Sequence, residues 1–202
     1  MTWVMFDYGG VLSHPPSPQD LASLAGAADV SVPALEDVYW EWRPAYDLAE
    51  LDAAGYWRQV GRSLGRSFNE AEISELVRLD SASWLRLQTG TVALIEDLAA
   101  AGLPLALLSN APGELAEAIS GLPVAAYFGH LLFSCQLKHA KPDPECYNRA
   151  LARLGASAED VIFIDDRAEN VAAAAALGLR SVHFTGPDEA RAAVTERLAG
   201  HG

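Results

Sequence analysis

From Thr91 to the end of the chain, short apolar runs alternate with segments of helical periodicity, and this alternation constrains the fold more than any other feature. Strands that alternate with helices build a parallel sheet with helices on both faces. We therefore predict an α/β fold with a Rossmann-like parallel sheet, and we expect the opening run to join it. The apolar runs are "TWVMF", "LPLALLSN", "HLLFS", "VIFIDD" and "RSVHF".

Between the first strand and this alternating region, the sequence shows only helical periodicity, from Leu21 to Trp84. Apolar residues recur there at i, i+3, i+4 and i+7, as in Leu35, Val38, Tyr39 and Trp42. The proline-rich "SHPPSPQD" at 13–20 predicts an irregular linker. We expect a split α/β core, residues 1–14 and 86–202, with a small all-helical cap, residues 15–85, inserted after the first strand.

Composition excludes several classes of function. The chain has 14 Lys and Arg against 27 Asp and Glu, a net charge of −13, so it repels nucleic acid. No apolar run reaches the roughly 18 residues of a membrane span, and the opening run lacks the basic flank of a signal peptide. We expect a cytoplasmic protein without a membrane partner. Cys135 and Cys146 form no metal or disulfide pattern, and the sequence does not indicate the oligomeric state.

Several apolar runs end in polar residues that a parallel sheet would bring together at one edge, where open α/β sheets bind ligands. These residues are Asp7, Ser109, Asn110, Asp165 and Asp166. Lys141 precedes a helix that starts at the same edge, so it adds one cation to three carboxylates. Grouped carboxylates repel one another unless a cation compensates, and hard oxygen ligands suit Mg²⁺. The sequence therefore predicts a Mg²⁺ site.

Junctions between strands and helices also favour Asp, Asn and Ser for purely structural reasons. Asp166, with a glutamate three residues on, has the form of a capping box, and Asn110, two residues before a proline, fits a helix cap. Asp143, immediately before a proline, fits a cap so well that we assign it no catalytic role. Asp7 is followed by two glycines and by no amphipathic helix. Capping does not explain Asp7, so a functional role is favoured there.

With these positions located, the sequence resembles the haloacid dehalogenase superfamily of aspartate-nucleophile hydrolases over essentially the whole chain. The first motif of that family, a strand ending in DxDGT or DxDGV, corresponds to DYGGV from Asp7. The second, a Ser or Thr after a strand, corresponds to Ser109, and the third, a lysine before a helix, to Lys141. The acidic pair Asp165 and Asp166 corresponds to the fourth. The helical block resembles the small inserted cap of the family.

The resemblance implies a Mg²⁺-dependent reaction through an aspartyl-phosphate. Asp7 would attack phosphorus, and its other oxygen, the Gly9 carbonyl and Asp166 would hold the metal ion. Asp165 and Asn170 would support the metal from outside its coordination sphere.

The same resemblance assigns residues to the phosphoryl group of a small phosphorylated substrate, such as a sugar phosphate. Ser109 would donate a hydrogen bond to a phosphoryl oxygen and act with Lys141 and Asp7 in catalysis. Lys141 would stabilise the developing charge and orient Asp7. Asn110 would take part in binding the substrate.

The first motif departs from the phosphatase pattern at Gly9, where the family has an aspartate that protonates the leaving oxygen. A general acid/base contributes typically about 10²- to 10⁴-fold, so we expect attenuated turnover. One interpretation is a working hydrolase that borrows another acid, for which His14 and Asp20 are nearby candidates. Another is a protein that binds a phosphorylated ligand or partner without efficient hydrolysis.

A third interpretation is a 2-haloacid dehalogenase, which uses the same aspartate on carbon and needs no second Asp. Dehalogenases resemble D-x-Y-G-T, with tyrosine two residues after the nucleophile, whereas Tyr8 comes one residue after it and should point elsewhere. They also lack the acidic pair that Asp165 and Asp166 form. Phosphoryl chemistry is therefore favoured, and dehalogenation ranks lowest.

The cap is rich in aromatic residues, which packing explains better than a sugar-stacking platform, because Tyr39, Trp42 and Trp57 fall on apolar helical faces. Trp40 lies off that stripe. Arg43, expected at the end of a helix, is interpreted as favouring the helix C-terminus rather than binding an anion. A small cap favours small phosphorylated metabolites over proteins, but it does not separate sugar, nucleotide and organic acid phosphates.

Overall fold

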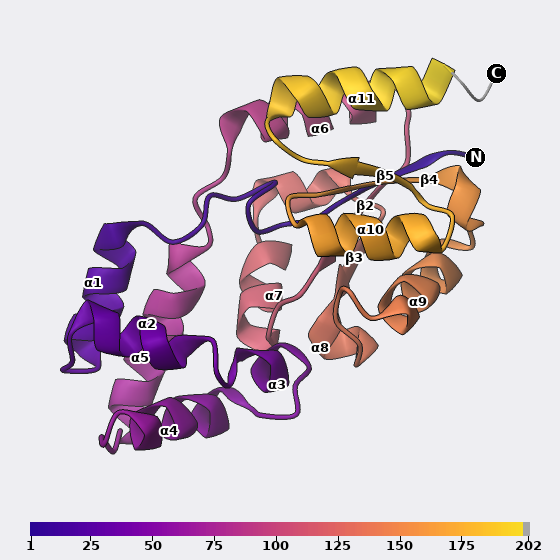
Figure 1. Ribbon diagram of the computed structural model, residues 1–202. Coiled ribbons are helices and arrows are strands. Elements are labelled where there is room, and N and C mark those ends of the chain that lie inside the picture. Colours follow the sequence, from indigo (N-terminus) through magenta and orange to yellow (C-terminus); the bar gives the residue numbers. More distant parts are fainter. Residues whose placement is uncertain (200–202) are drawn as a thin grey trace.

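The computed structural model describes residues 1–199 and contains a five-stranded parallel sheet with its helices and a smaller helical unit beside it (Figure 1). The strand order is β3-β2-β1-β4-β5, so the first strand of the chain lies at the centre of the sheet. The α/β fold class predicted from the sequence is confirmed. The strands are β1 (Trp3–Phe6), β2 (Leu105–Ser109), β3 (His130–Phe133), β4 (Val161–Asp165) and β5 (Arg180–His183).

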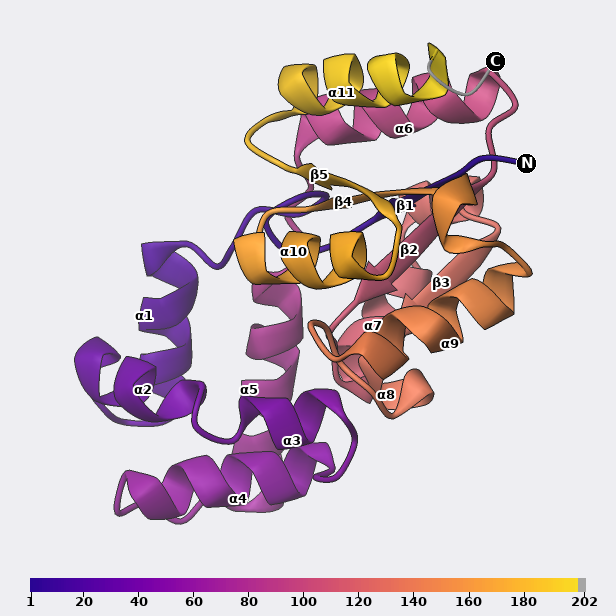
Figure 2. The same ribbon diagram turned by 45° about the vertical axis from the view of Figure 1, so that its right-hand side comes forward.

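Each face of the sheet is covered by its own helices, as predicted (Figure 2). Val4 and Phe6 of β1 belong to the apolar cluster that includes α6 and α11, whereas Met5 belongs to the cluster that includes α9 and α10. Side chains alternate between the faces because a strand has a period of two. The helical segments here are α6 (Thr89–Ala100), α7 (Gly113–Ser120), η1 (Pro123–Tyr127), α8 (Ser134–Leu137), α9 (Pro144–Leu154), η2 (Ala158–Asp160), α10 (Ala168–Ala176) and α11 (Pro187–Ala199).

The helical unit lies between β1 and α6 in the chain and packs around its own apolar cluster, with Tyr56 and Trp57 fully buried at its centre. Its helices are α1 (Pro18–Ala27), α2 (Val32–Tyr39), α3 (Arg43–Asp47), α4 (Ala53–Ser63) and α5 (Glu70–Ser83). We call this unit the cap; its predicted boundaries, residues 15 and 85, stay a prediction. Among residues 1–199, no helix combines the length and the apolar character needed to cross a membrane.

Two local predictions in the cap are wrong. The proline-rich stretch 13–20 is not irregular throughout, because α1 begins at Pro18, where a proline in the first turn removes no helical hydrogen bond. Ser17 is the N-cap of α1, and Asp20 completes a capping box with it. The second error concerns α2, which ends at Tyr39, so Trp42 precedes α3 instead of continuing the stripe of α2.

Candidate active site

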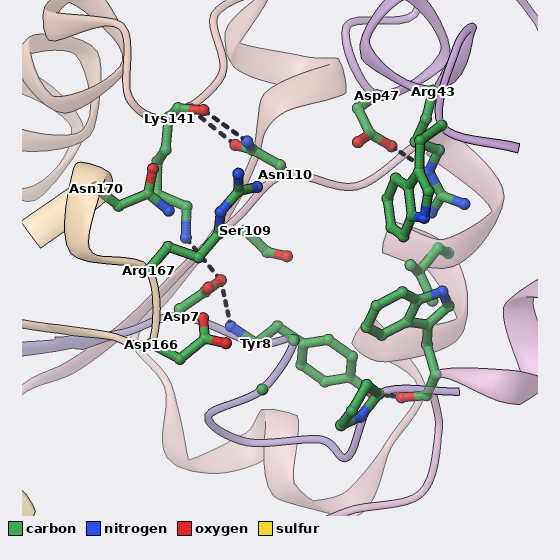
Figure 3. A pocket seen from close by; sticks show the side chains of 16 residues that line it. Asp7, Tyr8, Arg43, Asp47, Ser109, Asn110, Lys141, Asp166, Arg167 and Asn170 are labelled. Atoms are coloured by element: carbon green, nitrogen blue, oxygen red, sulfur yellow. Dashed lines mark hydrogen bonds and ion pairs between the residues drawn. The ribbon is translucent and has the colours of Figure 1, made fainter. Parts of the chain in front are cut away.

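The carboxyl end of β1 lies where the strand order reverses, with β2 on one side and β4 on the other. Open α/β sheets bind ligands in the crevice beyond such a point. A cavity of about 250 Å³ opens there, between the loops that follow the strands and the cap (Figure 3). Asp165 is fully buried beside this cavity. The other predicted site residues line it, namely Asp7, Gly9, Ser109, Asn110, Lys141, Asp166 and Asn170.

Strand alternation explains why Asp7, Asp165 and Lys141 meet. Asp7 and Asp165 continue the alternation of Met5 and Phe163, whose side chains pack with α9 and α10. Lys141 lies just before α9 on that same face. Its ammonium lies 2.6 Å from Asp7 Oδ1 and 2.7 Å from Asp165 Oδ2. One cation is thereby placed between two carboxylates at the edge of the sheet, with its side chain only 1% exposed.

Burial has opposite effects on the two kinds of charged group in this cluster. It raises the pKa of Asp7 to about 7, because the charge of Lys141 offsets the desolvation only in part. Burial lowers the pKa of Lys141, but the charges of Asp7 and Asp165 outweigh it, so the net shift is upward. The lysine therefore stays an ammonium at neutral pH, and it neutralises one of the two carboxylates.

Asp165 is held by hydrogen bonds on every side. Besides Lys141, it accepts from the side chain of Asn170 at 2.9 and 3.0 Å and from the backbone N–H of Arg167 at 2.9 Å. These bonds leave Asp165 no free oxygen, so its carboxylate positions Lys141 and Asn170. Asn170 is itself buried, and its Oδ1 has no hydrogen-bond partner among the described residues.

Three observations fit a divalent cation at this edge. Carboxylate oxygens of Asp7, Asp165 and Asp166 lie within 4.8 Å of one another, and hard carboxylate oxygens suit Mg²⁺. The unpartnered Asn170 Oδ1 is a further oxygen that a metal-bound water would satisfy. Finally, a Cβ added to Gly10 would lie 2.2 Å from Asp166 Oδ2, and Gly10 has a φ of +78°, so a glycine there makes room for the Asp166 carboxylate.

The predicted capping roles at these junctions have mixed outcomes. The capping box of Asp166 is absent, because α10 begins at Ala168 and its N-cap, Arg167, makes no side-chain capping bond. The predicted helix-capping role of Asn110 is also wrong, because the N-cap of α7 is Pro112. Asp143 does cap α9, by accepting from the N–H of Glu145, as predicted. Thus neither Asp166 nor Asn110 caps a helix, whereas Asp143 does.

Ser109 ends β2, and Asn110 follows it next to Lys141. Ser109 is 4% exposed and lines the cavity. The side-chain amide of Asn110 donates to the Lys141 carbonyl at 2.8 Å and accepts from the Lys141 N–H at 2.9 Å. Asn110 therefore fixes the backbone of the lysine, which explains how Lys141 reaches the end of β1 from a loop.

The indole of Trp84 lies against Gly9. A Cβ added to Gly9 would lie 3.1 Å from the Trp84 ring, so no larger residue fits there unless the indole moves. Tyr8 holds this arrangement by donating its hydroxyl to the Trp84 carbonyl at 2.8 Å. Trp84 follows α5 in the chain, and the sequence carries no signal for its contact with Gly9.

Neither of the acids suggested from the sequence as a replacement lines the cavity. His14 is exposed outside it, and the carboxylate of Asp20 is bound to Ser17 in the capping box of α1. The acids that line the cavity among the described residues are Asp7, Asp166 and Asp47. Asp47 was not predicted, although its spacing of four residues from Arg43 is a signal for a helical ion pair.

The cap contributes Trp40, Arg43 and Asp47 to the cavity wall. The interpretation of Arg43 as a residue at a helix C-terminus is wrong, because Arg43 begins α3. Its side chain is 4% exposed and forms ion pairs with Asp47 at 2.8 Å and with Asp80 of α5 at 3.1 Å. Trp40 is 58% exposed, consistent with its position off the apolar stripe.

Comparison with known proteins adds independent information. The sequence model of the family described as haloacid dehalogenase-like hydrolase matches residues 1–178. A sesquiterpene phosphatase of Aspergillus oryzae is 26% identical over 183 residues, which cover 90% of this chain and 88% of that protein. Hexitol phosphatase A of Escherichia coli is 28% identical over 182 residues, covering 83% of this chain and 82% of that protein.

Solved structures show the same fold. The magnesium complex of a HAD family enzyme from Bacteroides thetaiotaomicron matches with a TM-score of 0.77 at 18% sequence identity, covering 91% of this chain and 93% of that chain. At this level of identity the similarity concerns the arrangement of the backbone.

Proposed function

Because the chain belongs to the haloacid dehalogenase-like hydrolase family, we propose that it hydrolyses phosphate monoesters of small metabolites, with the Asp7 carboxylate as nucleophile. The observation that carries this proposal is the Lys141 ammonium, 2.6 Å from Asp7 at the carboxyl end of the central strand. The names of the two relatives, a sesquiterpene phosphatase and a hexitol phosphatase, support a phosphorylated small molecule as substrate. Sugar phosphates are among the candidates.

The hydrogen bonds of Asp7 suit a nucleophile. Its Oδ1 accepts from the Tyr8 N–H at 2.6 Å and pairs with Lys141, whereas no hydrogen bond from the described residues reaches Oδ2. The carboxylate is thus held by one oxygen while the other is available to attack phosphorus. Lys141 and the hydroxyl of Ser109 would then bind the phosphoryl oxygens, where negative charge develops.

Mg²⁺ is the cofactor that the site fits. Asp7, Asp166 and the Gly9 carbonyl would hold it, with Asp165 and Asn170 supporting them. When bound, the ion neutralises carboxylate charge and polarises the phosphoryl group. The net charge of −13 argues against a nucleic acid partner. The free, buried thiols of Cys135 and Cys146 suit a cytoplasmic protein.

One experiment tests the activity directly. Purified protein is incubated with a panel of phosphate esters, and phosphate release is measured with Mg²⁺, with EDTA, and after Mg²⁺ is restored. We expect EDTA-sensitive release that Asp7→Asn abolishes. Asp143→Asn is the matched control, because it removes the same charge outside the cavity and asparagine is an equally good N-cap.

Two results would contradict the proposal. If no ester releases phosphate but a phosphorylated metabolite raises the melting temperature, the protein is a binding module, an alternative that Gly9 in the place of the second aspartate favours. If a 2-haloacid releases halide without metal, the protein is a dehalogenase. Against the latter, the Tyr8 hydroxyl is already bonded to the Trp84 carbonyl.

A double variant is needed to test whether Gly9 lowers turnover. Gly9→Asp alone would place its side chain against the Trp84 ring, so we expect it to lower stability without raising turnover. Combined with Trp84→Ala, which vacates the space, Gly9→Asp is expected to raise turnover above that of Trp84→Ala alone. Equal turnover of Trp84→Ala and the double variant would show that the missing aspartate does not limit the reaction.

A further inference from the structure

The cap holds a second buried cluster in which one cation lies between two carboxylates. Arg43 Nε donates to Asp47 Oδ1 at 2.8 Å, and Arg43 Nη1 donates to both oxygens of Asp80, at 3.1 and 3.3 Å. The hydroxyl of Tyr39 also bonds to Asp80. Asp80 is therefore bound on both oxygens and only 3% exposed, which makes it the inner carboxylate of the cluster.

Asp47 is the outer carboxylate, and it lines the cavity that contains Asp7. Its Oδ1 is bound to Arg43, whereas no hydrogen bond from the described residues reaches its Oδ2. Figure 3 shows Asp47 across the cavity from Asp7 and Lys141, with this second oxygen turned away from Arg43. Burial raises the pKa of Asp47, although the charge of Arg43 opposes the shift.

Three consecutive residues of the cap hold this carboxyl in place above the sheet. Tyr46 donates its hydroxyl to Glu114 of α7 at 2.8 Å. The Asp47 carbonyl accepts from the Ser134 hydroxyl at 2.6 Å, and the Leu48 carbonyl accepts from Lys138 at 3.4 Å. The side chain of Tyr46 and the backbone carbonyls of Asp47 and Leu48 are thus bonded to the core, so the position of the carboxyl relative to the sheet edge is defined.

We propose that Asp47 is the general acid and base of the reaction, supplied by the cap in place of the aspartate that Gly9 lacks. The inference rests on the proposed phosphatase activity and adds a catalytic residue to it. Gly9 carries no acidic group, and His14 and Asp20 lie outside the cavity. Arg43 is no alternative donor, because a guanidinium stays protonated at any physiological pH.

The two half-reactions balance with this residue. In the first, an Asp7 oxygen forms a bond to phosphorus, the bond from phosphorus to the ester oxygen breaks with its electron pair, and the Asp47 proton passes to that oxygen. In the second, the Asp47 carboxylate takes a proton from a water whose oxygen bonds to phosphorus, and the bond to Asp7 breaks. The products are alcohol and phosphate, with Asp7 ionised and Asp47 protonated as at the start.

The dependence of the rate on the leaving group tests this role. A general acid matters for a poor leaving group and little for one that leaves as a stable anion, so wild type and Asp47→Asn are compared on phenyl phosphate and on 2,4-dinitrophenyl phosphate. For Asp47→Asn we expect kcat/KM to fall by about 10²-fold or more on phenyl phosphate but by less than about 3-fold on the dinitrophenyl ester. A residue with a purely structural role would lower both equally.

Controls separate this role from folding and from the other acids. His14→Gln and Asp20→Asn should leave the ratio of the two rates unchanged, and the melting temperature is measured for every variant. Asp47→Glu keeps a carboxylic acid at the site and is expected to restore part of the activity on phenyl phosphate. If Asp47→Asn does not fold, Asp47→Ser, which also lacks a carboxylic acid, is compared with the wild type on the two esters in its place.

Equal losses on both esters, or no loss on either, would overturn the role of Asp47 while leaving the phosphatase proposal intact. So would an Asp47→Ser variant whose two rates keep the wild-type ratio after Asp47→Asn has failed to fold. Failure of the phosphatase proposal looks different, because wild-type protein would then release phosphate from neither ester.

Discussion

The protein buries two clusters of the same charge type, one at the edge of the sheet and one in the cap. In the first, Lys141 lies between Asp7 and Asp165, and in the second, Arg43 lies between Asp47 and Asp80. Each has an inner carboxylate with both oxygens bound and an outer carboxylate with one free oxygen facing the common cavity.

The two clusters differ in how the chain assembles them. The sheet cluster joins residues 7, 141 and 165, which only the parallel sheet brings together, and Asp166 beside it fits a metal ion. The cap cluster is partly local, since Arg43 and Asp47 are one helical turn apart and aromatic rings surround the guanidinium. A buried charge pair is therefore not evidence of catalysis by itself. A catalytic role in each cluster is supported by the carboxylate oxygen that has no hydrogen bond from the described residues and lies at the shared cavity.

The largest expected effect on activity concerns Lys141, the cation of the sheet cluster. Lys141→Met is expected to lower the rate of phosphate release by roughly 10³-fold, because the ammonium stabilises charge that develops in the transition state. Lys138→Met, which alters the only other lysine of the chain, should keep most of the activity. Steady-state phosphate release with saturating Mg²⁺ measures both, and a Lys141→Met variant with near wild-type turnover would remove the sheet cluster from the mechanism.

The next effect separates the clusters by stability. Arg43→Met leaves Asp47 and Asp80 buried without their cation, which should cost about 3–5 kcal/mol of the free energy of unfolding. Urea denaturation measures this loss, and Mg²⁺ should not reverse it, whereas Mg²⁺ should partly stabilise Lys141→Met. Arg78→Met, which breaks an exposed pair with Glu75, is the control and should cost less than about 1 kcal/mol. A similarly small loss in Arg43→Met would mean that the cap does not depend on its cluster.

A third test concerns the metal, which only the sheet cluster is expected to bind. Gly10→Ala would push a Cβ into the Asp166 carboxylate, so the Kd for Mg²⁺ should rise by about 10- to 100-fold in a calorimetric titration. Gly102→Ala is matched to it, because Gly102 has a φ of +77° but open space around its Cβ. If both variants bind Mg²⁺ as tightly as wild type, Asp166 is not a ligand.

The smallest effect tests the outer carboxylates through pH. Asp7, whose pKa burial raises from 3.8 to about 7, binds its proton more tightly in the folded state. Its contribution to stability is therefore fully present below pH 3.8 and lost as the pH rises toward 7. Burial shifts the pKa of Asp47 in the same direction.

We thus expect metal-free protein to lose stability between pH 5 and 7, and Asp7→Asn and Asp47→Asn each to reduce that loss. Urea denaturation at several pH values measures it. The exposed acids whose pKa is lowered, such as Asp143 and Glu145, titrate below this window. If the free energy of unfolding of the wild type rises with pH in this range, the pKa values of Asp7 and Asp47 are not raised in the folded state.

The sheet and its edge could be predicted from the sequence because they depend on patterns that can be read directly along the chain. The alternation of helices and strands identified the fold, and the order of Asp7, Ser109, Lys141 and Asp165 along the chain indicated which loops meet. These residues lie at strand ends or before helices, so their positions follow from topology alone.

The cap wall could not be predicted in the same way. The prediction for Arg43 is wrong because a proline after a residue can mark the end of one helix or lie in the first turn of the next. Here that proline lies in the first turn of α3. The contact between Trp84 and Gly9 depends on how the cap meets the core, and no local pattern encodes it. Asp47 lines the cavity because two residues of α3, Tyr46 and Asp47, are hydrogen-bonded to α7 and α8 of the core.

The central place of β1 in the sheet has a consequence for how the protein forms during synthesis. This strand is translated before both of its neighbours in the sheet, residues 105–109 and 161–165. The nucleophile is therefore made well before the strands that flank it, and it reaches its working position only once residue 165 has been translated.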